Sequence, residues 1–177
     1  TQVHPLPTIA PVRNRLVHTR EVGSVGRSLG FAAGAALRAE LARIGRTPDD
    51  LGYLVQATCL AHDIGNPPFG HAGEEVIADW MGGFLRQERV AALGLDPDLA
   101  RFDGNAQGFR ILTRADGYRQ RGGMKLTVAT LAAFLKYPWA ADDPRAARGG
   151  RPGVKFGHFA TEAAAFAAVR DAAGLHG

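Results

Sequence analysis

Along most of this chain, hydrophobic residues recur among polar ones at the spacing that is typical of α-helices. Between Leu51 and His62, apolar and small side chains recur three or four positions apart, which places them on one helical face. The preceding Thr-Pro-Asp-Asp segment (47–50) predicts the start of that helix, because it offers a hydroxyl cap, a proline for the first turn and two acids near the positive end of the helix dipole. Further helices are expected over residues 15–30, with 31–44 as a continuation or the next helix, and over 72–85, 105–113, 126–135 and 161–173.

Turns rich in glycine and proline separate these segments. Residues 65–70, Gly-Asn-Pro-Pro-Phe-Gly, end the helix before them, since proline lacks a backbone donor and glycine permits sharp turning. Residues 141–153 combine charges with helix breakers and predict an exposed, mobile loop, not a domain boundary. No alternating strand pattern of useful length and no internal repeat are found. The sequence therefore predicts an all-α protein.

Composition narrows the class of protein without specifying a function. A chain of 177 residues fits one domain, and 46% hydrophobic with 21% charged residues is typical of a soluble globular protein. No apolar run reaches the roughly 18 residues that span a bilayer, and no secretory signal is visible. The single cysteine, Cys59, lies in a helical context and is expected to be a small buried residue, which favours a cytoplasmic location. The net charge of +4 comes largely from scattered arginines, and such scatter more often indicates a solvated surface than a nucleic-acid groove. A basic balance still suits a polyanionic ligand such as a nucleotide triphosphate.

The densest candidate chemistry is the dipeptide His62-Asp63, followed by His71 and Glu74. Imidazole nitrogen and carboxylate oxygen are ligands that divalent ions prefer. Adjacent helical residues point about 100° apart, so His62 and Asp63 can converge on one ion only where a helix ends, as the turn after them predicts. A His-Asp dipeptide alone is more often a capping or surface pair, and the longer string around it changes that balance.

Residues 62–74, His-Asp-Ile-Gly-Asn-Pro-Pro-Phe-Gly-His-Ala-Gly-Glu, closely resemble the signature of the dGTPase (deoxyguanosinetriphosphate triphosphohydrolase-like) family of the HD-domain superfamily. Residues 15–22 resemble that family's Arg-x-x-His-Ser segment, residues 102–110 its Gly-Asn-Ala-Gln motif and residues 136–139 its Lys-Tyr-Pro-Trp motif. The opening Thr-Gln-Val (1–3) matches the end of its Lys-Thr-Gln-Val stretch. The matches cover nearly the whole chain in family order.

This resemblance implies an HD-domain helical bundle, of which residues 1–177 are the incomplete amino-terminal portion of the catalytic domain. The implied reaction is hydrolysis of a deoxynucleoside triphosphate, dGTP or a broader set, to a deoxynucleoside and inorganic triphosphate. It implies a divalent metal ion, Mn²⁺ or Mg²⁺, with Fe²⁺ as the alternative. It further implies a homo-oligomer, a hexamer in the family, with a deoxynucleotide or single-stranded nucleic acid as an effector and no membrane partner.

The resemblance also assigns roles to individual residues. His18, His62 and Asp63 match three of the four metal ligands. His71 and Glu74 match the pair that activates or places the attacking water near the α-phosphate, and their spacing puts them on one helical face.

The substrate site is assigned in the same way. Arg15 matches an arginine that contacts the phosphates, a role that suits the forked donors of a guanidinium. Gln2 matches the residue that recognises the sugar 3′-hydroxyl, and the positions that line the nucleotide and phosphate site match Asn105, Lys136 and Tyr137. Structural interpretations remain beside these roles: Asn105 can cap a helix, His18 can be an ordinary helix histidine, and Tyr137 can be a core aromatic.

Other residues are expected to be structural. Trp139 is interpreted as a core aromatic in preference to a binding residue. The histidines with no defensible partner spacing, expected in structural or surface positions, are His4, His158 and His176.

The chain departs from the family pattern at its ends. The fourth metal ligand, an aspartate on a later helix, is expected beyond Gly177, and the chain begins inside a motif, so a fragment of a longer enzyme is expected. Asp142 and Asp143 resemble the missing segment but lie in the breaker-rich loop, and we interpret them as decoys because a rigid ligand needs a supported position. Two alternatives stay open: another HD-superfamily phosphohydrolase, such as a nucleotidase or cyclic-nucleotide phosphodiesterase, and an inactive nucleotide-binding fragment.

Overall fold

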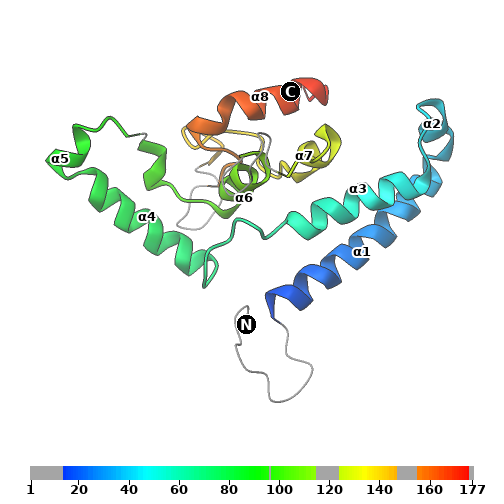
Figure 1. The fold of residues 1–177 in the computed structure, drawn as a ribbon, viewed down its shortest axis with the longest axis horizontal. Helices are drawn as coiled ribbons and strands as arrows, with labels where there is room; N and C mark the ends of the chain where they lie inside the picture. The colour runs from blue at the N-terminus through cyan, green and yellow to red at the C-terminus, as the bar shows by residue number, and fades with distance from the viewer. Residues whose placement is uncertain (1–13, 96, 115–123, 147–154, 176–177) are drawn as a thin grey trace, which may run out of the picture. The chain divides into compact units, whose positions relative to one another are not determined.

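A computed structural model describes residues 14–95, 97–114, 124–146 and 155–175. Their regular structure is helical, and an isolated bridge between Ala140 and His158 is the one β-type pairing among them. The elements in chain order (Figure 1) are α1 (Arg15–Ala36), α2 (Arg38–Arg43), α3 (Pro48–Ala61), α4 (His71–Leu85), α5 (Glu88–Ala91), η1 (Pro97–Ala100), α6 (Gly104–Thr113), α7 (Val128–Phe134), η3 (Ala160–Glu162) and α8 (Ala163–Ala172). The predicted all-α class is confirmed. The short elements α5 and η1 were not predicted, and the predicted helix 161–173 is divided into η3 and α8.

The chain divides into two compact units, residues 1–62 and 63–177. The first unit contains α1, α2 and α3. Helix α1 begins where the Asn14 side chain accepts a hydrogen bond from the Val17 N–H at 2.9 Å. It ends at Ala36, so residues 31–44 are partly its continuation and partly the separate helix α2. The interpretation of residues 1–177 as part of one HD domain stays a prediction.

Helix α3 begins as its sequence predicts. Thr47 Oγ1 accepts from the Asp50 N–H at 3.3 Å, while Asp50 Oδ2 accepts from the Thr47 N–H at 2.7 Å, so two terminal donors are satisfied reciprocally. The helix runs to Ala61, and His62 follows as its C-cap residue. His62 therefore lies directly after the last turn of α3, at the end of the first unit.

Helices α1 and α3 lie side by side (Figure 1) because glycines remove the side chains that would separate them. The buried residues of α1 are a stripe that we call the α1 glycine stripe: Gly23, Gly26, Gly30 and Gly34. A Cβ atom on Gly30 would lie 2.9 Å from the Leu51 carbonyl oxygen and 2.9 Å from the Val55 Cβ. Cys59 packs against this stripe at Gly26, as expected for a small helix-facing residue, although it is only half-buried.

The core of the second unit is aromatic. Its largest fully buried side chains are those of Phe109, Phe156, Phe159, Leu112 and Asp103. The Phe109 ring meets the Phe166 ring of α8 edge to face at 5.6 Å between centroids, which joins α6 to α8. A second cluster places Ala106 of α6 against Phe156 and Phe159.

Two residues from the start of the predicted mobile loop belong to this core, so the expected exposure is wrong for Ala141 and Ala146, whereas Asp142, Pro144 and Arg145 are exposed as predicted. Ala141 is 4% exposed and Ala146 1% exposed, and both pack in the cluster of Phe156 and Phe159. The charged residues between them do not prevent burial, because Asp143 and Arg145 pair with each other at 2.8 Å toward solvent. Small apolar residues are thus buried in the core, although they belong to a segment whose charges and helix-breaking residues predict exposure. Residues 147–154 lie outside the described part of the chain.

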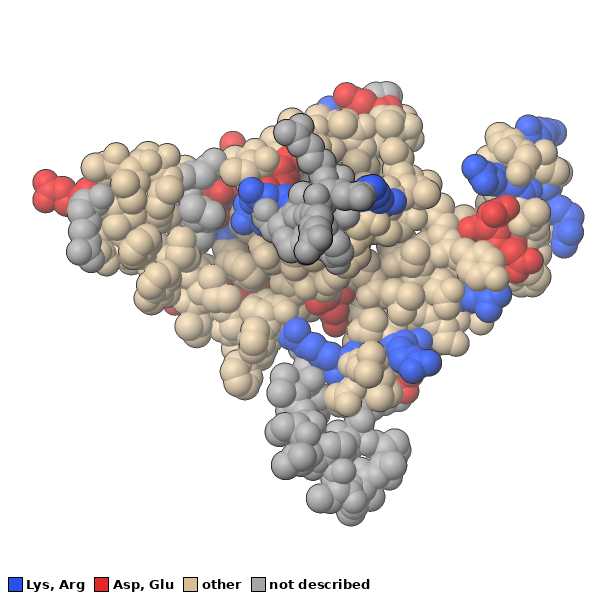
Figure 2. Space-filling model, in the orientation of Figure 1, with Lys and Arg blue, Asp and Glu red and all other residues tan. Residues whose placement is uncertain are grey.

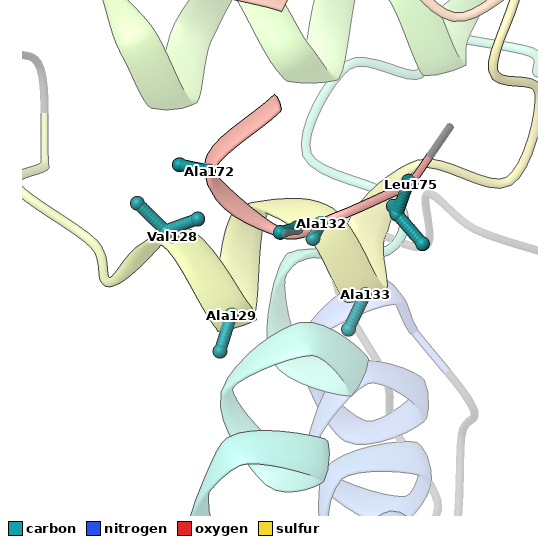
Figure 3. A pocket seen from close by; sticks show the side chains of 7 residues that line it. Val128, Ala129, Ala132, Ala133, Ala172 and Leu175 are labelled. Atoms are coloured by element: carbon teal, nitrogen blue, oxygen red, sulfur yellow. The ribbon is translucent and has the colours of Figure 1, made fainter. Parts of the chain in front are cut away.

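The surface carries two further features. Basic side chains gather over α2 (Figure 2), whose sequence supplies Arg38 and Arg43, both exposed as the scattered charge pattern predicts. Helix α7 and the end of α8 border an open apolar hollow of about 520 Å³, lined by alanines together with Val128 and Leu175 (Figure 3). Within the described residues, no helix combines the length and the apolar character that a membrane crossing requires.

The α1 glycine stripe generates a stability prediction. Gly30→Val forces two methyl groups toward the α3 backbone, and we expect the free energy of unfolding to fall by about 1–3 kcal/mol, the usual cost of overpacking. The matched control is Gly83→Ala in α4, where a Cβ atom meets nothing within 4 Å. That variant should gain about 0.5–1 kcal/mol from the higher helix propensity of alanine. Urea denaturation followed by circular dichroism measures both, and a Gly30→Val protein as stable as the original would contradict the close packing.

Candidate functional site

The packing of α1 on α3 brings two histidines together. Nδ1 of His62 lies 2.6 Å from the Cys59 carbonyl oxygen, and because a carbonyl only accepts, this nitrogen carries the proton. In the neutral ring Nε2 of His62 is then unprotonated, and it faces Nε2 of His18 at 3.3 Å. The two rings meet edge to face at 5.2 Å between centroids. Residues 44 positions apart in sequence thus present nitrogen atoms to one small region.

Asp63 completes a group of ligand atoms. It is bonded directly to His62, at the residue where the second unit begins, so the peptide bond keeps it beside that histidine. One ligand atom from each of His18, His62 and Asp63 lies within 4.8 Å of the other two. Two imidazole nitrogens and a carboxylate oxygen suit a divalent metal ion. The structure therefore brings together the three residues that the sequence predicts as metal ligands.

Asn66 orients the carboxylate of this group. Its Nδ2 donates to Asp63 Oδ1 at 2.7 Å, the type of outer contact that holds metal-binding side chains in position. Asp143, one of the two predicted decoys, pairs with Arg145 instead. Neither Asp142 nor Asp143 joins the ligand group in the described part of the chain.

His71 and Glu74 form the pair that their spacing predicts. Nδ1 of His71 lies 2.7 Å from Oε2 of Glu74, within the first turn of α4. The two side chains differ in environment, because that of His71 is 71% exposed and that of Glu74 only 9%. A buried carboxylate thus supports a histidine that faces solvent.

Two further groups hold the Glu74 carboxylate. The backbone N–H of Gly104 donates to Oε1 at 2.9 Å, and Lys155 Nζ donates to Oε2 at 3.0 Å. Burial raises the pKa of Glu74, but the hydrogen bonds from His71, Gly104 and Lys155 outweigh it, so the pKa lies below the usual range. Glu74 is therefore ionised at neutral pH and can only accept, which assigns the proton to Nδ1 of His71 and leaves Nε2 as the available basic nitrogen.

Gly104 is the point of closest approach between α6 and this pair. A Cβ atom there would meet Oδ1 of Asn66 and lie 2.9 Å from Oε1 of Glu74. The absence of a side chain lets the α6 N-terminus touch Glu74 and Asn66 at once. Asn66 thereby connects Asp63 to the surroundings of Glu74 inside the second unit.

Sequence reasoning missed Lys155. It contacts Glu74 across 81 positions, and no spacing rule connects residues so far apart. Lys155 Nζ also lies 3.2 Å from Oδ2 of Asp103, and the side chain is 22% exposed. Burial lowers the pKa of Lys155, while the charge of Asp103 and the contact with Glu74 raise it, with a net increase.

The predicted substrate-binding residues within the described part of the chain lie in different elements. Arg15 opens α1, one turn before His18. Lys136 is exposed, with Nζ 5.3 Å from the Tyr137 ring centroid. Asn105 does not cap the helix, which corrects that interpretation: Asp103 is the N-cap residue, and Oδ1 of Asp103 accepts from both the N–H and Nδ2 of Asn105 at 2.7 Å.

The structural interpretations of two aromatic residues are confirmed. Trp139 packs against the core cluster, and its Nε1–H donates to the Lys155 carbonyl oxygen at 2.7 Å. His158 is 8% exposed, and its ring lies 4.1 Å from that of Phe166. Gln2, His4 and His176 lie outside the described residues.

Comparison with known proteins supports the resemblance seen in the motifs. The chain is 46% identical over 167 residues to a deoxyguanosinetriphosphate triphosphohydrolase-like protein of Pseudomonas aeruginosa, with 92% of this chain and 36% of the relative covered. It is 46% identical over 187 residues to a protein of the same name from Synechocystis, with 100% and 42% covered. A Streptomyces coelicolor relative of that name is 38% identical over 170 residues, with 92% and 31% covered.

The chain spans about a third of the length of the curated relatives that it matches. No family model matches it.

The environment of Glu74 predicts a pH-dependent contribution to stability. Because its folded-state pKa is lowered, its contribution is present above the unfolded value near 4.5 and is lost as pH falls through the lower folded value. The stability difference between the original protein and Glu74→Gln should therefore be large at pH 7 and shrink below about pH 4.5. Urea unfolding across pH 3–7 measures it, with the exposed Asp171→Asn as control. A difference independent of pH would show that the Glu74 charge is not stabilised by its partners.

Proposed function

We propose that this chain, a homologue over most of its length of the deoxyguanosinetriphosphate triphosphohydrolase-like proteins, is part of a metal-dependent enzyme that hydrolyses deoxynucleoside triphosphates. The products would be a deoxynucleoside and inorganic triphosphate. The observation that carries the proposal is the ligand group of His18, His62 and Asp63, followed along the chain by the His71–Glu74 pair. The chain spans only about a third of the length of these relatives, so the activity is proposed for the whole protein.

His18, His62 and Asp63 would hold the metal ion, Mn²⁺ or Mg²⁺ with Fe²⁺ as the alternative. Their donor set fits such an ion, and because Nδ1 of His62 carries the proton, its Nε2 has the lone pair that coordination needs. When bound, the ion supplies a Lewis acid for an α-phosphate oxygen. The fourth ligand proposed for this site is an aspartate outside the present sequence.

His71 would act as the general base. Its Nε2 has no proton in the neutral ring, and the side chain is exposed, so a water molecule can approach it. As that nitrogen takes the proton from the attacking water, the ionised Glu74 stabilises the imidazolium through Nδ1–H. Proton transfer of this kind contributes about 10²–10⁴-fold to rate.

The substrate contacts are proposed from the same homology. Arg15 and Lys136 would neutralise the triphosphate, and Gln2 would recognise the 3′-hydroxyl. Asn105 and Tyr137 would line the nucleotide site. The proposal extends to a cytoplasmic homo-oligomer with a deoxynucleotide or single-stranded nucleic-acid effector, and it includes dGTP and other deoxynucleotides as substrates.

The direct test incubates the protein with dGTP and Mn²⁺ and separates the products by ion chromatography. Triphosphate with deoxyguanosine in equal amounts supports the proposal. Pyrophosphate or single phosphate would overturn it in favour of another phosphohydrolase. Nucleotide binding without turnover, in a protein of confirmed native length, would favour the nucleotide-binding alternative.

The two groups of residues make separable predictions. His71→Gln should lower kcat by about 10²–10⁴-fold, because the general base is lost, while Mn²⁺ binding stays intact. His62→Gln should weaken both Mn²⁺ binding and activity, because a ligand is lost. Electron paramagnetic resonance of free Mn²⁺ measures binding even where turnover is absent. The surface variant Asp171→Asn should change neither quantity, and loss of Mn²⁺ binding in His71→Gln would contradict the separation of roles.

A further inference from the structure

Asp103 carries a buried charge that its structural role does not require. It is the N-cap of α6, where Oδ1 accepts from the Asn105 N–H, and its side chain is completely buried. A neutral serine, threonine or asparagine caps a helix equally well. An ionised carboxylate in a dry position is costly unless a charge compensates it. The second oxygen, Oδ2, is therefore the part of Asp103 that needs an explanation.

The group next to Oδ2 is the ammonium of Lys155. Oδ2 makes no geometrically satisfactory hydrogen bond among the described residues, but it lies 3.2 Å from Lys155 Nζ. The same ammonium donates to Glu74 Oε2 at 3.0 Å. Lys155 thus bridges two buried carboxylates, one that caps α6 and one that supports His71.

The backbone of Lys155 is already held on both sides. Its N–H donates to the Ala146 carbonyl oxygen at 3.0 Å, and its own carbonyl accepts from the Trp139 indole. What remains to be fixed is the side chain, a flexible four-carbon stem with a strongly hydrated head. With Glu74 as its one anionic partner and 22% of the side chain exposed, the ammonium would exchange readily with water.

We propose that Asp103 is a positioning residue, whose second carboxylate oxygen holds the Lys155 ammonium against Glu74 and so keeps Glu74 paired with His71. The His71–Glu74 pair is then the exposed end of a chain of four polar side chains in contact, which is anchored at the start of α6. The inference rests on the proposed function, since positioning matters only where His71 acts on a substrate. The raised pKa of Lys155, to which the charge of Asp103 contributes against desolvation, is consistent with this arrangement.

Lysine acetylation tests the arrangement without any need for activity. The chain has three lysines, of which Lys125 and Lys136 are exposed and serve as internal references. Acetylation with a small anhydride at pH 8, read by peptide mass spectrometry, should be slow at Lys155. In Asp103→Asn and Asp103→Ser, both of which keep a cap acceptor, Lys155 acetylation relative to Lys125 should rise at least about threefold, because the ammonium loses a charge that holds it protonated.

The matched control is Thr127→Ala, which removes the N-cap of α7 in the same unit without touching Lys155. It should leave the Lys155 to Lys125 ratio unchanged. Circular dichroism identifies any variant that has unfolded. Two Asp103 variants are used so that the ratio can still be measured if one of them fails to fold. An unchanged ratio in a folded Asp103 variant, or an equal rise in Thr127→Ala, would overturn the proposal.

A double-mutant cycle then separates positioning from capping. If Asp103 acts through Lys155, the loss of kcat in Asp103→Asn should largely disappear when it is measured on a Lys155→Met background. Additive losses would show that Asp103 acts through the helix alone and would overturn the positioning role. Absence of hydrolysis in the original protein would count against the proposed function, whereas the acetylation ratio would still decide whether Asp103 holds Lys155.

Discussion

The buried carboxylate of Glu74 is the constraint around which the second unit is arranged. A charge with so little exposure is tolerated only where other groups compensate it, and each of its partners comes from a different segment. His71 lies on the same helical turn, the Gly104 N–H lies 30 positions away and Lys155 lies 81 positions away. The start of α4, the start of α6 and the segment before η3 must therefore meet at one point.

Small residues make both parts of the candidate site geometrically attainable. In the first unit, the α1 glycine stripe lets α1 approach the backbone of α3, and this approach places His18 opposite His62. In the second unit, Gly104 lets the N-terminus of α6 contact Glu74. In each case a missing side chain determines how close two chemically active groups come.

The turn of residues 65–70 separates the metal-suited group from the proposed general base along the chain. Before it, α3 ends and leaves His62 and Asp63 at its terminus, where adjacent residues can serve one ion. After it, α4 starts at His71 with Glu74 one turn further on. Asn66 binds Asp63 from within the turn and lies against Gly104, so the turn is itself packed onto the α6 terminus.

The sequence by itself determined the features that depend on residues close together along the chain. The capping box of Thr47 and Asp50, the main helices and the His71–Glu74 contact all follow from residues within one helical turn of each other. The grouping of His18 with His62 was accessible only through resemblance to a family, since no periodicity links them. The Asp103 cap of α6 is local too, because it joins residues two positions apart, although Asn105 was expected in that role from the sequence. The tertiary structure alone decided that Lys155 joins Glu74 to Asp103 and that Ala141 and Ala146 are buried. These contacts depend on the path of the chain between distant segments, and that path is selected by burial of the aromatic core, which no local pattern specifies.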